Sequence, residues 1–236
     1  MTLDELVSQL RASYGSALRS IVLYGSAAAG EYDPKRSDYN VLVIVDALDA
    51  SRLAGASAAS RAWADAGNPA PLTLTLPEWR GSADIFPMEY ADILERHRVL
   101  FGDPPFDGIH VDLKDLRLQL EQEAMGKLIK LRQGLLASGN DAPRQLELLT
   151  ASVSTIMIIF RAFLRMHAET PPTDNRALAE ATARRAGFDA TPFTRVVNHV
   201  RGETSISTSD AGEVLAGYLR GMQTLVRYLD QYQHSA

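Results

Sequence analysis

Two short apolar runs on either side of a small-residue turn restrict the fold of this chain more than any other feature. The first run, residues 21–24, gives way to a glycine and a serine, and the second, residues 39–45, begins beside Asp38 and includes Asn40. Each run has the length and the β-branched content of a buried strand. The chain is therefore expected to begin with a small domain built on these strands.

The polar residues around this turn have the character of an anion site. Side chains two apart on a strand point to the same face, so Asp38 and Asn40 are expected to point together. The turn at Gly25 and Ser26 lets the backbone approach a phosphate closely. If a helical turn begins near Ser26, its free N–H groups and the serine hydroxyl would favour an anion there. These residues predict a phosphate site with one carboxylate beside it.

The order Gly-Ser, spacer, and acidic-x-acidic on a strand resembles the signature of the nucleotidyltransferase superfamily, which includes DNA polymerase β and kanamycin nucleotidyltransferase. The resemblance implies that Gly25 and Ser26 bind nucleotide phosphates and that Asp38 is the first of the carboxylates that coordinate Mg²⁺. Asn40 stands where the second carboxylate would be. Its amide oxygen can still bind a metal, but one negative charge is missing beside the expected ions.

The resemblance also implies a third carboxylate from a neighbouring strand. A strand is expected over residues 85–90, and Glu89 is the candidate there, as a metal ligand or general base. The catalytic candidates are thus Asp38 and Glu89, and the candidate Mg²⁺ ligands are these two with Asn40. Glu89 could instead be an edge-strand acid that faces water. Glu31 and Asp33, in the spacer, are the acids that could swing inward to replace the missing charge.

Hydrophobic spacing predicts an α+β chain in two parts, a small mixed-sheet nucleotidyltransferase-like domain and an all-α helical bundle. A Gly/Pro cluster that begins at Gly102 places the boundary between residues 1–103 and 104–236. The first part is expected to hold an N-terminal helix from Leu3 that Thr2 or Asp4 caps, strands at residues 21–24, 39–45, 72–76 and 85–90, and a helix over 51–66 ended by Gly67.

The second part shows apolar residues at three- and four-residue steps, as in amphipathic helices. Four or five helices are expected: one from residue 113 to near 139, a more buried one over 146–166, two shorter ones at 175–186 and 191–200, and a last one around 215–229. In kanamycin nucleotidyltransferase and its relatives, such a bundle helps to bind the acceptor.

Composition excludes several classes of function. A formal net charge of −5 gives no general attraction to nucleic acid, so a nucleic-acid partner is not expected. The absence of cysteine excludes disulfides, zinc–thiolate sites and thiol nucleophiles, and it favours a reducing cytoplasm. The N-terminus has no basic stretch followed by an apolar core, and no apolar run is expected to span a membrane, so a cytoplasmic protein is predicted.

Three functions stay open from these residues. The first is a nucleotidyltransferase that binds a Mg²⁺–nucleoside triphosphate and transfers the nucleoside monophosphate to a hydroxyl acceptor. The second is a pseudoenzyme that binds the nucleotide as a sensor without transfer, because Asn40 leaves the carboxylate set incomplete. The third is an interaction module that resembles an antitoxin-like nucleotidyltransferase and helical-domain pair fused in one chain. The sequence does not identify the acceptor, the nucleotide base or the oligomeric state.

Overall fold

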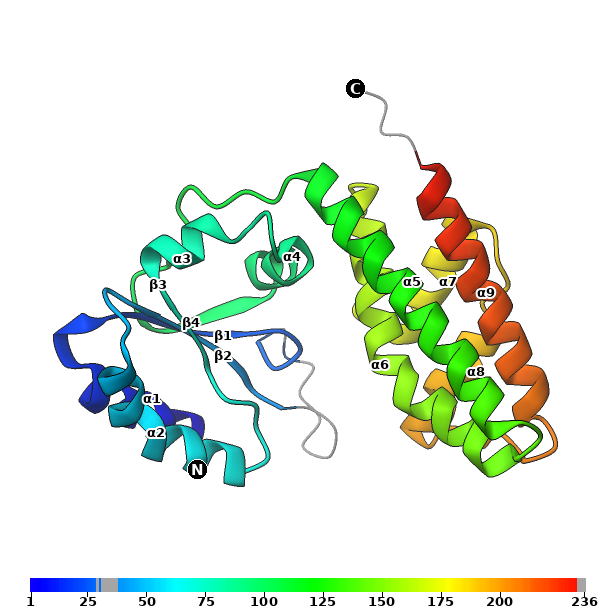
Figure 1. Cartoon of the computed structure of the whole chain (residues 1–236), viewed down its shortest axis with the longest axis horizontal. Helices are drawn as coiled ribbons and strands as arrows, with labels where there is room; N and C mark the ends of the chain where they lie inside the picture. Colours follow the sequence, from blue (N-terminus) through cyan, green and yellow to red (C-terminus); the bar gives the residue numbers. More distant parts are fainter. Residues whose placement is uncertain (29, 31–37, 233–236) are drawn as a thin grey trace. The chain divides into compact units, whose positions relative to one another are not determined.

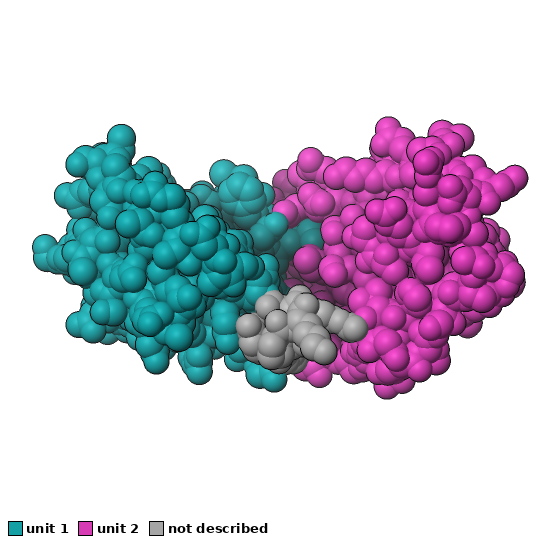
Figure 2. All heavy atoms as spheres, turned by 90° about the horizontal axis from the view of Figure 1, so that it is seen from below, with its two compact units in different colours: residues 1–112 teal, residues 113–236 magenta. Residues whose placement is uncertain are grey.

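The computed structural model describes residues 1–28, 30 and 38–232, and it divides into two compact units, Met1–Asp112 and Leu113–Ala236 (Figure 2). The boundary expected from the sequence falls earlier, after Asp103. The segment that follows this position packs with the first unit, because Ile109 is buried in one of its cores and Phe106 and Val111 pack against that core. Each unit is described by itself.

The first unit contains a four-stranded mixed sheet with helices on both faces (Figure 1). The strand order is β3-β2-β1-β4, with β1 antiparallel to β2 and β4, and β2 parallel to β3. In chain order the elements are α1 (Leu3–Tyr14), η1 (Gly15–Ala17), β1 (Leu18–Tyr24), β2 (Asn40–Val45), α2 (Ala50–Asp65), β3 (Leu72–Thr75), α3 (Leu76–Gly81), α4 (Pro87–Glu95) and β4 (His97–Gly102).

Side-chain alternation along the central strands divides the core of this unit into two layers. On one face, Leu23 and Val43 pack with α1 and α2, whose Leu10 and Trp63 are buried. On the other face, Leu42 and its neighbours pack with α3 and α4. Figure 1 shows the two helix pairs on opposite sides of the sheet. The predicted mixed-sheet domain is confirmed.

One predicted strand is wrong. Residues 85–90 do not form a strand; the chain turns at residues 83–85, and α4 begins at Pro87. Proline is favoured in the first turn of a helix, and a glutamate there interacts favourably with the helix dipole. The fourth strand is β4, which pairs with β1 from Tyr24 opposite His97. Glu89 therefore lies on a helix and not in the middle of a strand.

The second unit is a bundle of helices, as predicted. The described helices are α5 (Leu113–Ser138), α6 (Ala142–Met166), α7 (Asn175–Ala186), α8 (Thr191–Arg201) and α9 (Ala211–Gln231). Helix α6 packs with each of the other four. Its Phe160 lies 5.2 Å from Phe193 of α8, between ring centroids, and Phe193 stacks on Tyr218 of α9 at 4.4 Å. All three rings are fully buried and form the centre of the bundle.

Helix α6 corrects the expectation about apolar runs. It begins at Ala142, earlier than expected, because Asp141 caps it and accepts a hydrogen bond from the backbone N–H of Arg144. Among the described residues, this 25-residue helix alone is long and apolar enough to cross a membrane by length and composition. Half of its apolar window is buried inside the bundle, as in the core helix of a helical domain.

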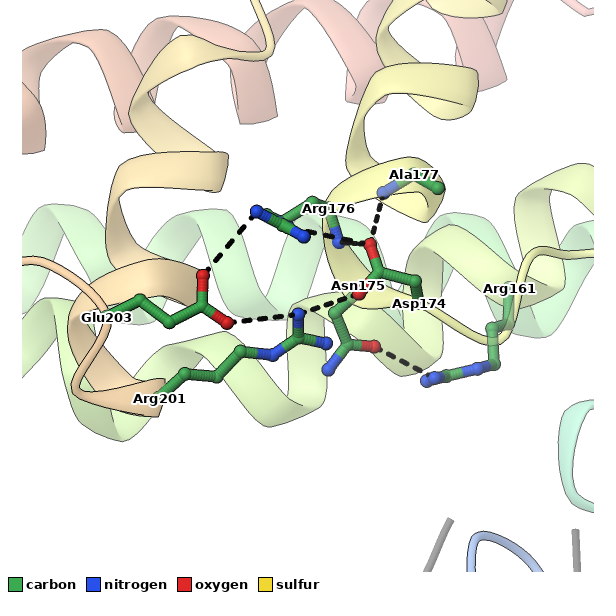
Figure 3. A network of polar contacts seen from close by, with 7 residues as sticks. All are labelled: Arg161, Asp174, Asn175, Arg176, Ala177, Arg201 and Glu203. Atoms are coloured by element: carbon green, nitrogen blue, oxygen red, sulfur yellow. Dashed lines mark hydrogen bonds and ion pairs between the residues drawn. The ribbon is translucent and has the colours of Figure 1, made fainter. Parts of the chain in front are cut away.

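A polar network fixes the start of α7 against its neighbours (Figure 3). Asp174 caps the helix, since its carboxylate accepts from the backbone N–H of Ala177 at 2.9 Å. The same side chain pairs with Arg201 at the end of α8, at 2.7 Å. Next to it, Asn175 accepts a hydrogen bond from Arg161 of α6 at 2.9 Å. One helix N-terminus thus joins three helices of the bundle.

Candidate functional site

The glycine turn after β1 is held by backbone hydrogen bonds on both sides. Gly25 has φ +77°, a conformation that glycine adopts without steric cost. Its N–H donates to the carbonyl oxygen of Arg96 at 3.0 Å, and its own carbonyl oxygen accepts from the N–H of Ala28 at 3.1 Å. Residues 26–28 form a turn, and not the first turn of a helix as considered for Ser26. The backbone around Gly25 is therefore fixed relative to the start of β4.

The start of β2 lies directly beside this turn. Asn40 is the cross-strand partner of Tyr24, the residue before Gly25. A Cβ atom added to Gly25 would lie 3.7 Å from the side-chain nitrogen of Asn40. The same nitrogen donates a long hydrogen bond of 3.5 Å to the carboxylate of Asp38. The structure therefore brings Gly25, Asp38 and Asn40 together at one end of the sheet.

Tyr39 anchors the residue pair on either side of it. Its backbone N–H donates to the side-chain oxygen of Asn68 at 3.0 Å, and its ring lies 6.0 Å from that of Trp63, between centroids. Tyr39 packs against the core layer under α1 and α2. Because strand side chains alternate, Asn40 lies on the same face as Leu42 and Ile44, the face that α3 and α4 cover, and Asp38 is placed beside it by their hydrogen bond.

The hydroxyl of Tyr24 is affected by acidic residues of α4 as well as by Asp38. Burial raises the pKa of the Tyr24 hydroxyl, and the negative charges of Asp92, Glu89 and Asp38 raise it further. All three carboxylates are therefore within electrostatic reach of this hydroxyl. The charges of Glu89 and Asp38 both act on Tyr24, but Glu89 lies on helix α4 and not on the strand expected from the sequence.

Asp92 and Arg96 also belong to this region, although neither is predicted from the sequence. Arg96 binds the carboxylate of Asp92 through two nitrogens, at 2.5 and 3.1 Å, and both side chains are largely buried. The backbone oxygen of Arg96 also holds Gly25. Their four-residue spacing on a helix was the available signal. A cation and an anion of α4 and its end thus lie next to the glycine turn.

The candidate metal ligands are oxygen donors, but the residues that the structure describes do not form a group of three carboxylates or imidazoles. Asp38, Glu89 and the amide oxygen of Asn40 are hard oxygen ligands of the kind that Mg²⁺ prefers. However, β3, the strand beside β2, carries only leucine and threonine. Within residues 1–28, 30 and 38–232, no three His, Asp or Glu side chains are grouped so that they could hold a metal ion together. Glu31 and Asp33 lie outside the described residues.

Comparisons with known proteins show the fold. No protein-family model and no curated protein matches the chain. Among solved structures, the chain is similar to a spectinomycin adenyltransferase from Enterococcus faecialis, crystallised with ATP and spectinomycin. The TM-score is 0.61 at 12% identity, and the match covers 97% of this chain and 98% of that one. At this identity the likeness establishes a shared fold, a nucleotidyltransferase-like domain followed by a helical bundle.

Proposed function

We propose that this chain binds a nucleoside triphosphate at the Gly25 turn, with Mg²⁺ held by Asp38, and that nucleotidyl transfer is slow or absent. The observation that carries the proposal is the meeting of the Gly25 turn with Asp38 and Asn40 at one end of the sheet. A fixed turn without side-chain bulk lets phosphate oxygens approach the backbone, and Ser26 adds a hydroxyl donor. Asp38 supplies the anionic ligand for the metal that accompanies the triphosphate.

The charges around Asp38 disfavour the transfer step. Transfer requires a hydroxyl oxygen to attack the α-phosphorus, form the new P–O bond and lose its proton, while pyrophosphate leaves. Two Mg²⁺ ions about 4 Å apart would stabilise the attacking and leaving oxygens. Asn40 removes one of the charges that such a pair needs, and β3 supplies none. The amide of Asn40 instead donates to Asp38, an arrangement that is stable without a second cation.

Glu89 is a candidate site residue whether the chain only binds the nucleotide or also transfers it. Its charge acts on the Tyr24 hydroxyl together with that of Asp38. When a nucleotide is bound, Glu89 is the candidate to accept the proton of an acceptor hydroxyl or to bind the metal. Asp92 positions this region, since it holds Arg96, which directly precedes β4 and whose backbone oxygen binds Gly25.

An active nucleotidyltransferase with a hydroxyl acceptor is the second candidate. It is favoured by the full-length likeness to an adenyltransferase that was crystallised with ATP and spectinomycin. The retained Gly25, Asp38 and Glu89 support it as well. The two candidates share the nucleotide site and differ in whether pyrophosphate is released.

Thermal unfolding with a panel of nucleoside triphosphates and Mg²⁺ tests the nucleotide site. A ligand at one hundred times its dissociation constant stabilises a protein by about 2.7 kcal/mol. We expect a rise in melting temperature with at least one triphosphate and its loss in Asp38→Ala. Asp46→Ala is the matched control, because Asp46 follows the opposite end of β2 and pairs with Arg19.

Pyrophosphate release over a panel of hydroxyl acceptors separates the two candidates. Stabilisation without release supports the binding function, and Asp38-dependent release establishes the transferase. If no triphosphate at millimolar concentration changes the melting temperature and none is consumed, the nucleotide site itself is refuted.

A further inference from the structure

Helix α5 carries a second apolar face that the bundle does not cover. Its first face is buried against α6 and α9. The second consists of large apolar side chains that are 41–84% exposed: Leu118, Met125, Ile129 and Leu136. An exposed line of large apolar residues on a helix is typical of a surface that binds a partner.

These four residues form one straight line, called here the α5 stripe. Two residues seven apart on an α-helix point within about 20° of each other. Leu118 and Leu136 are about five full turns apart, so they point in the same direction. Met125 and Ile129 lie between them along the helix and are rotated to opposite sides of that direction by about 20° each. The stripe is about 27 Å long at 1.5 Å per residue. It is long enough to pair with another helix over most of its length.

The stripe is symmetric about its own middle. Leu118 and Leu136 are equally far from Lys127 along the helix, and so are Met125 and Ile129. A second copy of α5, placed antiparallel and related by a two-fold axis at the level of Lys127, would set Leu118 against Leu136 of the second copy and Met125 against its Ile129. A two-fold interface requires this kind of self-complementary surface.

The polar residues on the borders of the stripe have the same symmetry. Glu121 and Arg132 lie on one border, and Gln122 and Gln133 lie on the other. A two-fold axis places equal borders together, so Glu121 would face Arg132 of the second copy, and Gln122 would face its Gln133. Parallel pairing would instead bring opposite borders together, so Glu121 would face Gln122 of the second copy and Arg132 its Gln133, and neither charge would gain an opposite partner. Glu121 already pairs with Arg117 of its own helix at 3.1 Å, and that contact can remain.

We propose that the α5 stripe is the interface of an antiparallel homodimer of this chain. The charge complementarity of Glu121 with Arg132 and the symmetric apolar positions both specify a second copy as the occupant. Burial of the stripe would remove four large apolar side chains from water. This proposal does not depend on the nucleotide site, so each can fail without the other.

Cross-linking provides a direct test, because the natural chain has no cysteine. Leu118→Cys and Leu136→Cys are prepared as separate full-length proteins and treated with a short bismaleimide, alone and mixed. The antiparallel pairing predicts cross-linked dimers in the mixture and none with either protein alone. The control pair is Glu123→Cys with Lys130→Cys, since both residues are exposed on α5 and point away from the stripe. This mixture should not cross-link.

Light scattering after size exclusion then measures the dimer itself over a range of protein concentrations. The unmodified chain should be dimeric, and Leu136→Glu should raise the dimer dissociation constant by about tenfold or more. Leu136 is the most exposed of the four, so this variant should keep its far-UV circular dichroism and melting temperature. A chain that is monomeric at every concentration overturns the proposal. So does a dimer in which Leu118→Cys cross-links to itself or the control pair cross-links.

Discussion

Replacement of Asn40 by aspartate should make the first unit less stable without Mg²⁺ and more stable with it. In the natural chain the side-chain nitrogen of Asn40 lies 3.5 Å from the carboxylate of Asp38. Asn40→Asp would place two negative charges at about this separation. Their repulsion is about 1 kcal/mol with the screening of bulk water and about 5 kcal/mol at an effective dielectric constant of 20. Because Asp38 is exposed, we expect about 1–2 kcal/mol.

Thermal or urea unfolding in low salt with EDTA measures this loss. For a unit of 112 residues, a loss of 1–2 kcal/mol lowers the melting temperature by about 4–8 °C. Mg²⁺ should reverse the loss in Asn40→Asp, because the two carboxylates would then share a cation, and should change the natural chain less. Sodium chloride at high concentration should weaken the repulsion without reproducing the effect of Mg²⁺.

The exchange variant Asp38→Asn/Asn40→Asp is the matched control. It keeps one carboxylate and one amide and should unfold like the natural chain, with and without Mg²⁺. If Asn40→Asp is as stable as the natural chain in EDTA and gains nothing from Mg²⁺, Asn40 does not face Asp38 across a metal position, and the reasoning about the missing carboxylate is refuted.

Two further predictions concern backbone strain and pH. Gly25 and Gly102 both have positive φ, but an added Cβ at Gly102 would overlap the carbonyl oxygen of Arg19. Urea unfolding should therefore show that Gly102→Ala lowers the free energy of unfolding by about 3 kcal/mol and Gly25→Ala by about 1–2 kcal/mol. Equal losses in the two variants would contradict the close approach of β4 to β1. Burial, and then the charge of Arg185, lower the pKa of His167 below its ordinary 6.5. Neutral His167 therefore stabilises the bundle above pH 6.5. This stabilisation is lost as the pH falls from 6.5 through the lowered pKa, because the folded state resists protonation of the ring. An NMR titration should show the lowered pKa and its rise in Arg185→Gln, and a pKa above 6.5 in the natural chain would refute the assignment.

The hydrogen bonds of His167 agree with a lowered pKa of its ring. An arginine nitrogen can only donate, so the contact of Arg185 with Nδ1 of His167 at 3.1 Å makes Nδ1 an acceptor. The ring is then neutral with its proton on Nε2, which donates to the hydroxyl of Tyr228 at 3.2 Å. Protonation of Nδ1 would remove the bond to Arg185 and set two positive charges together.

The contact of Asp38 with Asn40 agrees with the two-residue period expected of a strand, although Asp38 lies before the first residue of β2. Their position beside Gly25 follows from the register of β1 and β2, which sets Tyr24 opposite Asn40. That register is determined by the pairing of two strands and not by either strand alone. The bounds of helix α7 could be predicted because both of its ends carry local signals, the cap Asp174 and the left-handed Gly187.

The placement of Glu89 could not be predicted in the same way. Apolar side chains at Phe86, Met88 and Tyr90 alternate like a strand, but residues 87, 88, 90 and 93 are the buried ones and follow the helical period. Pro87 decides between the two interpretations, because it fits the first turn of a helix. The contact of Gly25 with Arg96 joins residues far apart in the chain, and no local pattern indicates it.

The Gly25 turn and Asp38 together form the proposed nucleoside triphosphate site. Isothermal titration calorimetry of the natural chain with ATP and the other triphosphates, with Mg²⁺ and with EDTA, tests it most directly. We expect binding at one site per chain for at least one triphosphate, stronger with Mg²⁺, and a loss of about tenfold or more in affinity in Asp38→Ala but not in Asp46→Ala. No binding of any triphosphate at millimolar concentration, or equal binding by Asp38→Ala, would contradict the claim.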